Sequence, residues 1–175
     1  MVVSRTNGVV SHGQFQVGFR NGSDNDYVDI SLHPVGVIHY HIQDDGTSDE
    51  AWDSGSGHAD DQVHSYAVIP PTTTGGTPRM FVDGVADGSP TFSGDDGVDN
   101  NFWWDSVAEL FNVGMRGGTT GNELSNWVCY EVLIFDDVLT DQEVSDAHDI
   151  LTNASFTSFS DKTVRRRGRR VFFAF

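Results

Sequence analysis

The sequence predicts an all-β protein, built as a sandwich of two antiparallel sheets with one short helix near the C-terminal end. Apolar and polar residues alternate with a period of two in short runs that Gly, Asp, Asn and Ser separate, a pattern typical of half-buried strands joined by turns. The chain has 175 residues, of which 37% are hydrophobic and 19 are glycine. This is enough for one domain with a core and many turns.

The predicted strands follow one another along the chain. They cover residues 14–20, 27–32, 35–42, 63–69, 79–82, 110–116 and 127–135. In the first run Phe15, Val17 and Phe19 share one face. The last run, WVCYEVLIF, is apolar on both faces, which is typical of a strand in the interior of a sheet. The polar stretch 44–61 is expected to be turn-rich.

Two local motifs predict a hairpin and the helix. Asp83-Gly84 is the two-residue signal for a tight β-turn whose central positions need positive φ. Thr140 and Glu143 fit a capping box. Apolar residues follow at helical spacing, namely Val144, Ala147 and Leu151. The motif therefore predicts a helix over 141–152.

Charge divides the chain into two parts at Asp161. All 26 acidic residues lie at or before this position and six of the ten basic residues follow it, so 1–161, with four basic residues, carries −22 and 162–175 carries +6. The acids are 21 Asp and 5 Glu, and Lys162 is the only lysine. This composition resembles that of proteins from extreme halophiles, because molar salt shortens the screening length to about 3 Å and suppresses self-repulsion. An acidic surface for a basic partner is the alternative.

Four motifs between residues 60 and 152 stand in an informative order. They are DQVHSYAVI (61–69), RMFVDG (79–84), FNVGMR (111–116) and VLTDQEV (138–144), the last placed just after the long strand. Together they resemble the laminin G-like and related concanavalin A-like jelly-roll domains. The resemblance implies a jelly roll over 1–161, a structural role for His64, and rim loops that bind calcium, glycan or protein. The single Cys129 forbids the disulfide of many family members.

The sequence shows no catalytic motif, and we expect that the chain is not an enzyme. A glucanase of related fold needs two carboxylates about 5 to 5.5 Å apart on one strand, and its Glu-x-Asp-x-x-Glu arrangement does not occur. The nearest acids, Glu50 and Asp53, fall in the turn-rich stretch. Neither a membrane span nor a secretory signal is expected, because no run of about eighteen apolar residues and no N-terminal apolar h-region occurs.

Two places offer metal ligands. Asp95, Asp96 and Asp99 form an oxygen-rich loop of the kind that a calcium ion prefers, although clusters of Asp also arise from the composition alone. His39 and His41 would share one face of a strand and are compatible with a divalent metal. Without a third ligand nearby, these two are interpreted as half-buried strand histidines.

Aromatic residues next to amides suggest a glycan site. Trp103 and Trp104 lie beside Asn101, and such a patch stacks on sugar faces and hydrogen-bonds hydroxyls. Trp52 is a second candidate. The alternative for the adjacent pair is that one ring enters the core and the other stays partly exposed.

The tail, 162–175, is predicted to be a docking and assembly segment. Its candidate residues are Arg165, Arg166, Arg167, Arg169, Arg170, Phe172, Phe173 and Phe175. Nucleic acid is not the expected partner, since affinity for phosphates collapses at molar salt. Salting-out salts strengthen apolar burial, so we expect a strand that docks on a surface while its arginines pair with carboxylates of its own body or of a neighbouring copy.

These features combine into one functional hypothesis and one alternative. An adhesion domain without an export signal fits a virion component that is made in the host cytoplasm, assembled there and released by lysis. The hypothesis is a structural protein of a halophilic virus, displayed on a tail, fibre, turret or capsid surface, whose partners are other copies, other virion proteins and host surface glycan. The alternative is a cellular carbohydrate-binding module of a secreted haloarchaeal-type enzyme.

Overall fold

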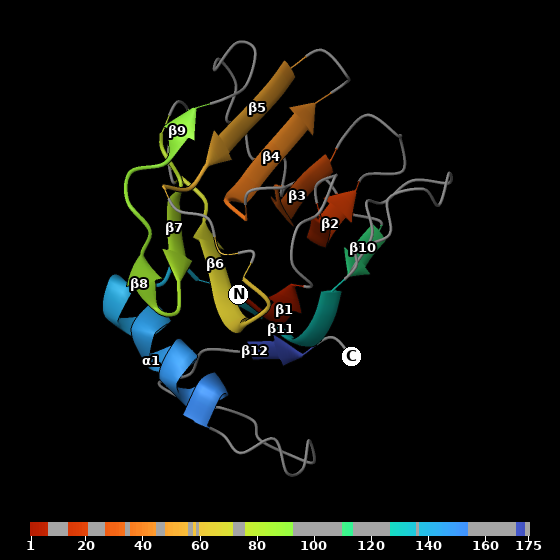
Figure 1. Cartoon of the computed structure of the whole chain (residues 1–175). Coiled ribbons are helices and arrows are strands. Elements are labelled where there is room, and N and C mark those ends of the chain that lie inside the picture. Colours follow the sequence, from red (N-terminus) through yellow and green to blue (C-terminus); the bar gives the residue numbers. More distant parts are fainter. Residues whose placement is uncertain are drawn as a thin grey trace.

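Strands dominate the structure, which is a computed structural model. It describes residues 1–6, 14–20, 27–33, 36–44, 48–55, 58, 60–71, 76–92, 110–113, 127–135, 137–153 and 171–173. Within these residues the chain forms two six-stranded antiparallel sheets and one helix, α1 (Asp141–Asn153) (Figure 1). The predicted class, an all-β chain with two antiparallel sheets and one short helix near the C-terminal end, is confirmed.

The two sheets are called sheet A and sheet B. Sheet A has the order β12 (Val171–Phe173), β11 (Trp127–Phe135), β1 (Val2–Thr6), β6 (Val63–Ile69), β7 (Arg79–Val82) and β8 (Val85–Ala86). Sheet B has the order β10 (Leu110–Val113), β2 (Gln14–Arg20), β3 (Tyr27–Leu32), β4 (Ile38–Asp44), β5 (Ser48–Asp53) and β9 (Thr91–Phe92). Strands at the start and near the end of the chain are thus neighbours in sheet A, where β1 pairs with both β11 and β6.

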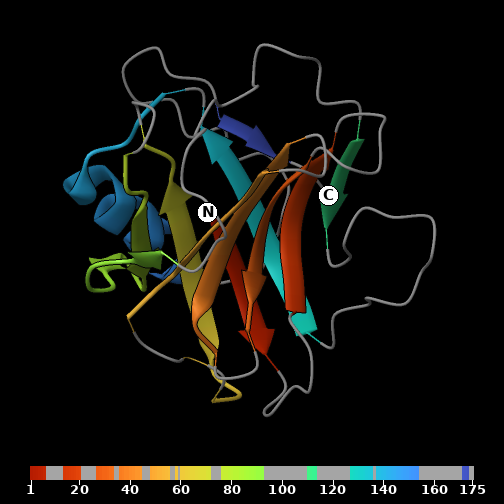
Figure 2. The same cartoon turned by 90° about the horizontal axis from the view of Figure 1, so that it is seen from above.

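The main core lies between the sheets, which form separate layers in Figure 2. Its buried side chains are Val28, Leu32, Ile38, Tyr40, Ile42, Trp52, Tyr66, Met80 and Val82. They come from β3, β4 and β5 on one side and from β6 and β7 on the other. Because successive side chains of a strand point to opposite faces, the alternate residues of β4 and β5 must lie on the outer face of sheet B.

Helix α1 and the segment before it cover part of the outer face of sheet A. Leu139 and Val144 pack on Ala67, Ile69 and Phe81, which are the outward residues of β6 and β7. Figures 1 and 2 show α1 beside β8 and outside the sandwich. Sheet A is therefore buried on both faces in this region.

The capping box starts α1 as the sequence predicts. The backbone N–H of Thr140 donates to Glu143 Oε2 (3.0 Å), and the N–H of Glu143 donates to Thr140 Oγ1 (3.3 Å). These two bonds satisfy donors that the first turn of a helix leaves free. The helix runs from 141 to 153, so its predicted range of 141–152 is confirmed.

The hairpin between β7 and β8 is also confirmed, and it touches α1. Asp83 and Gly84 have φ of +50° and +76°, as a two-residue turn with two positive φ values requires. A Cβ on Gly84 would lie 3.0 Å from the Cβ of His148 and 3.1 Å from the Cα of Ser145. Gly84 is therefore required for two reasons: it adopts the positive φ of the turn, and its lack of a Cβ leaves room for α1.

The strand predictions for 14–20, 27–32, 63–69, 79–82 and 127–135 are confirmed. The prediction for 35–42 starts too early, because β4 begins at Ile38 and Gly36 has φ of +81°, which is not an extended conformation. Of 110–116, the structure describes 110–113, which form β10. Strand β1 was not predicted.

The turn-rich interpretation of 44–61 is wrong for its central part. Residues 48–53 form β5, which pairs with β4 along its whole length and with β9 at its end. Ala51 and Trp52 are both buried, each with 5% of its surface exposed. Tertiary burial of these two side chains outweighs the turn preference of the Ser and Asp residues around them.

Candidate functional site

Histidine and aspartate side chains gather on the outer face of sheet B. Tyr40 and Ile42 of β4 are in the core, so His39 and His41 point the other way. In the register of the sheet, His39 stands between Ser31 of β3 and Asp53 of β5, and the next outward row places Asp29, His41 and Ala51 side by side. Two cross-strand His–Asp pairs thus occupy neighbouring rows.

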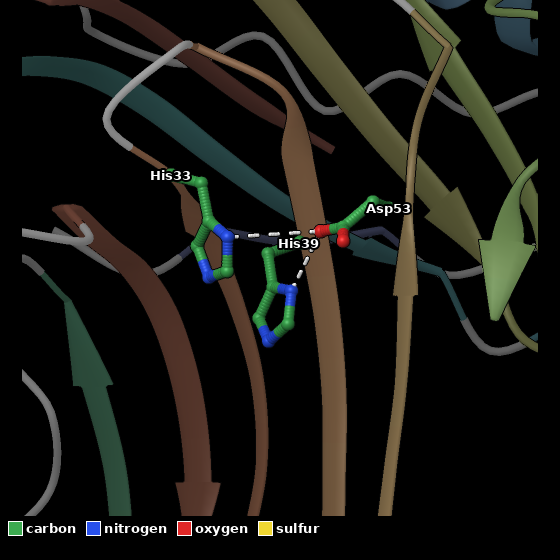
Figure 3. Close-up of side chains that lie close together, drawn as sticks. All are labelled: His33, His39 and Asp53. Atoms are coloured by element: carbon green, nitrogen blue, oxygen red, sulfur yellow. Dashed lines mark hydrogen bonds and ion pairs between the residues drawn. The ribbon is translucent and has the colours of Figure 1, made fainter. Parts of the chain in front are cut away.

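Asp53 lies against two imidazoles. The Nδ1 of His39 is 2.8 Å from Asp53 Oδ1 and forms a hydrogen bond with it, and the Nδ1 of His33 is 3.8 Å from the same oxygen. The two rings stack with centroids 3.8 Å apart and planes inclined by 19°. Figure 3 shows both contacts converging on one carboxylate oxygen. We call these three residues the His33–His39–Asp53 cluster.

The neighbouring row contains a second His–Asp pair. The Nδ1 of His41 is 3.9 Å from Asp29 Oδ2, and the rings of His39 and His41 are 5.5 Å apart. The side chain of Asp29 is only 3% exposed. A buried carboxylate requires polar or cationic partners, so His41 is placed to stabilise Asp29.

Burial and the neighbouring His39 act in the same direction on the pKa of His33. Burial lowers the pKa of His33 below its usual value of 6.5, the charge of His39 lowers this pKa further, and Asp53 opposes both effects. These effects favour the neutral form of the His33 imidazole at pH 7. A neutral imidazole has a lone pair that can bind a metal ion.

A second cluster lies where β6 meets the β7–β8 turn. The Nδ1 of His64 is 2.7 Å from Asp83 Oδ2, and its Nε2 is 2.9 Å from Asp60 Oδ1. Carboxylates only accept hydrogen bonds, so both ring nitrogens can donate only when His64 carries a proton on each. The aromatic neighbours of this ring are His58, at 5.3 Å, and Tyr66, at 5.9 Å between centroids.

The stability of the protein should depend on the protonation of His64. Burial alone lowers the pKa of His64, but the bonds to Asp83 and Asp60 outweigh burial and raise this pKa above 6.5. A raised pKa stabilises the folded state fully below the unfolded-state pKa, and this stabilisation is lost as pH rises through the folded-state pKa. We therefore expect His64→Gln to cost more free energy of unfolding at pH about 5.5 than at about 8.5.

Urea unfolding of the unchanged protein and of His64→Gln, each at pH about 5.5 and about 8.5 and at constant salt, measures this difference in free energy of unfolding. His148→Gln is the control, because His148 is also half-buried and hydrogen-bonded, to Ser65 Oγ at 2.9 Å, but faces no carboxylate in the described hydrogen bonds and ion pairs. A cost of His64→Gln that stays the same at both pH values would contradict the charged state assigned to His64.

Trp52 is not available as a ligand contact. Its ring is 5% exposed in the core, 6.0 Å from the ring of Tyr40 and edge-on to Phe92 at 5.4 Å. The prediction of a sugar-stacking surface at this position is therefore corrected to a core role. A tryptophan beside polar residues looks the same in the sequence whether its strand turns it inward or outward.

Other predicted site residues lie outside the described part of the chain. These are Asn101, Trp103, Trp104, Asp95, Asp96, Asp99, Arg165, Arg166, Arg167, Arg169, Arg170 and Phe175. Phe172 and Phe173 belong to β12, which pairs with β11. Glycan binding, calcium binding and the role of the arginines stay predictions.

The sequence interpretation found His39 and His41 but missed the partners of His39. Asp53 comes from β5, a strand that was not predicted, and His33 directly follows β3. The sequence does contain polar residues at alternate positions of both segments. To see which of these residues meet, however, one must know how the two strands pair, and the sequence does not give that register. That register brings His39 and Asp53, fourteen residues apart, into direct opposition.

Comparison with known proteins adds no assignment to this geometry. No protein-family model, curated protein or solved structure matches the chain. The one helix of the described residues is too short and too polar to cross a membrane. The class that the fold defines is a two-sheet antiparallel β-sandwich with a His–Asp cluster on one outer face.

Proposed function

We propose that this chain is a non-enzymatic structural and adhesion domain of a halophilic virus particle, a laminin G-like jelly roll whose C-terminal tail joins copies to one another. The observation that carries the proposal is the pairing of β12 with β11. Its register is Val171 with Phe135, Phe172 with Ile134, and Phe173 with Leu133. The basic and aromatic tail therefore contributes a strand to the sandwich.

Strand pairing at an edge suits assembly. An edge strand presents N–H and C=O groups that readily pair with another chain, and β12 stands at the edge of sheet A. Helix α1 ends at Asn153 and β12 begins at Val171, so residues 154–170 connect them. The ladder with β11 is the same whether β12 comes from its own copy or from a neighbour, and exchange between identical copies is a common route to oligomers.

The charges of the two parts fit the same role. The body carries −22 and the tail +6, so a tail is attracted to any copy of the body. At molar salt, screening over about 3 Å leaves only short-range ion pairs. Backbone pairing by β12 is then the main contribution, and the apolar sequence VFF suits molar salt, because salting-out salts strengthen apolar burial.

Deleting residues 164–175 should convert an oligomer into a monomer. The deletion removes β12 and five of the nine arginines, and with them the strand that can be exchanged. The mass of full-length and truncated protein is measured by light scattering after gel filtration in about 2 M salt, where the acidic bodies do not repel at long range. Far-ultraviolet circular dichroism checks that the truncated protein is folded.

A matched variant separates the strand from its charge. Changing all five tail arginines to glutamine keeps VFF and should keep the oligomer at high salt. If the truncated protein and the full chain have the same mass, β12 pairs within its own copy and the assembly role of the tail is wrong. If the glutamine variant is a monomer, the arginines and not the strand hold the copies together.

A further inference from the structure

We propose that His33, His39 and Asp53 form a binding site for one divalent first-row transition-metal ion of the Zn²⁺ class. The site lies on the outer face of sheet B, away from the core and from the β11–β12 pairing that carries the proposed function. Its three ligands come from three consecutive segments, namely the end of β3, strand β4 and strand β5. The ladder of the sheet holds His39 and Asp53, and the backbone N–H of His33, the residue after β3, donates to the carbonyl of Val37 (3.0 Å), so the backbone positions all three ligands.

The distances fit a small ion after modest side-chain rotation. One donor atom from each residue lies within 4.8 Å of the other two. Around a tetrahedral Zn²⁺ with bonds of about 2.1 Å, neighbouring donors are about 3.4 Å apart. The 2.8 Å between His39 Nδ1 and Asp53 Oδ1 would therefore open slightly, and the 3.8 Å between His33 Nδ1 and that oxygen would close slightly.

The donor set selects the class of metal. Two imidazole nitrogens and one carboxylate suit Zn²⁺, Co²⁺ or Ni²⁺, whereas Ca²⁺ and Mg²⁺ prefer sites built from oxygens alone. Asp53 brings the negative charge that compensates part of the charge of the ion. In the free protein the Nδ1 atoms of His33 and His39 both face Asp53 Oδ1 directly. A bound ion would lie between these three atoms and replace their direct contacts.

The cluster is accessible to an ion from solvent, and its three ligands leave one coordination position open. The side chains of His33, Asp53 and His39 are 38%, 27% and 13% exposed. The ion can therefore enter from solvent on the His33 side. Three protein ligands leave a fourth tetrahedral position for water or for a donor from another molecule, as in open zinc sites.

Titration of the full chain with Zn²⁺ tests the site. The protein must be free of any polyhistidine tag and treated with chelator, since five of its seven histidines lie outside the site and compete weakly for metal. Calorimetry with Zn²⁺ and visible absorption with Co²⁺ should both show one ion per chain. Bound Zn²⁺ should also raise the melting temperature, because a ligand that binds only the folded state stabilises it.

Three variants and one control decide the assignment. We expect His39→Ala, Asp53→Asn and His33→Ala each to weaken Zn²⁺ binding by at least about tenfold, a loss that even outer partners of a metal site cause. His148→Gln, a change on α1 far along the chain, should bind as the unchanged protein does. His33→Ala keeps the test valid if His39→Ala fails to fold, because the His33 side chain is the more exposed of the two.

Each outcome either supports or overturns the site. Loss of binding in the three variants and not in the control supports it. The site is overturned if the full chain shows no stoichiometric binding, or if the three variants bind Zn²⁺ as tightly as the unchanged protein does. The cluster is then a hydrogen-bonded His–Asp pair with a stacked imidazole. The oligomeric state of the tail deletion is measured independently, so failure of the metal site leaves the proposed assembly role unaffected.

Discussion

Replacing Trp52 by alanine is expected to lower the free energy of unfolding by about 3 to 5 kcal/mol, the range for removing a buried large aromatic side chain. The ring fills the space between the sheets next to Tyr40, and Phe92 meets its edge. Alanine leaves a cavity that the surrounding strands can close only in part. The loss therefore combines the missing burial with the missing packing contacts.

Urea unfolding in constant molar salt measures the effect of Trp52→Ala. The control is Val138→Ala, since Val138 is 49% exposed and surface changes usually stay within about 0.5 kcal/mol. If Trp52→Ala unfolds like the unchanged protein and instead loses binding on a glycan array, the core role is wrong and the ligand role first predicted for this tryptophan is restored.

Gly84→Ala is expected to lower the free energy of unfolding by about 2 to 5 kcal/mol, from two sources. A left-handed backbone costs a residue with a Cβ about 1 to 2 kcal/mol, and Gly84 has φ of +76°. The new Cβ would also press on His148 and on the backbone of Ser145 at 3.0 and 3.1 Å. Relief of such a clash requires α1 to shift, and overpacking costs about 1 to 3 kcal/mol.

Gly88→Ala is the matched control for Gly84→Ala. Gly88 has a similar φ of +67°, but a Cβ there would meet only the Cα of Gly55 at 3.6 Å, an ordinary contact. We expect this control to cost only the backbone part, about 1 to 2 kcal/mol. The difference between the two variants measures how closely the hairpin turn fits the helix. Equal losses would show that α1 does not depend on that fit.

Several elements of the fold could be predicted because their signals are local. The hairpin turn is encoded by two adjacent residues, Asp83 and Gly84, and the helix start by Thr140 and Glu143, three positions apart. Strand β11 was predicted because nine consecutive residues have the composition of a buried strand. In each case the residues that carry the signal are also the residues that make the interaction.

Strand β5 could not be predicted for the opposite reason. Its sequence, SDEAWD, has the composition of a turn, and it becomes a strand because β4 and β9 pair with it. The same pairing brings Asp53 to His39 and turns Trp52 into the core. Missing this strand therefore accounts for both the overlooked ligand Asp53 of the candidate metal site and the misplaced Trp52.

The sequence by itself determined the class of the fold, the hairpin, the helix and its cap, and the division into an acidic body and a basic tail. Only the tertiary structure decided that β1 lies between β11 and β6, that β12 pairs with β11, and that His33, His39 and Asp53 meet. The physical reason is the range of the interactions. Periodicity, turns and caps depend on neighbours in the chain, whereas strand order and register depend on which distant segments bury their apolar faces together.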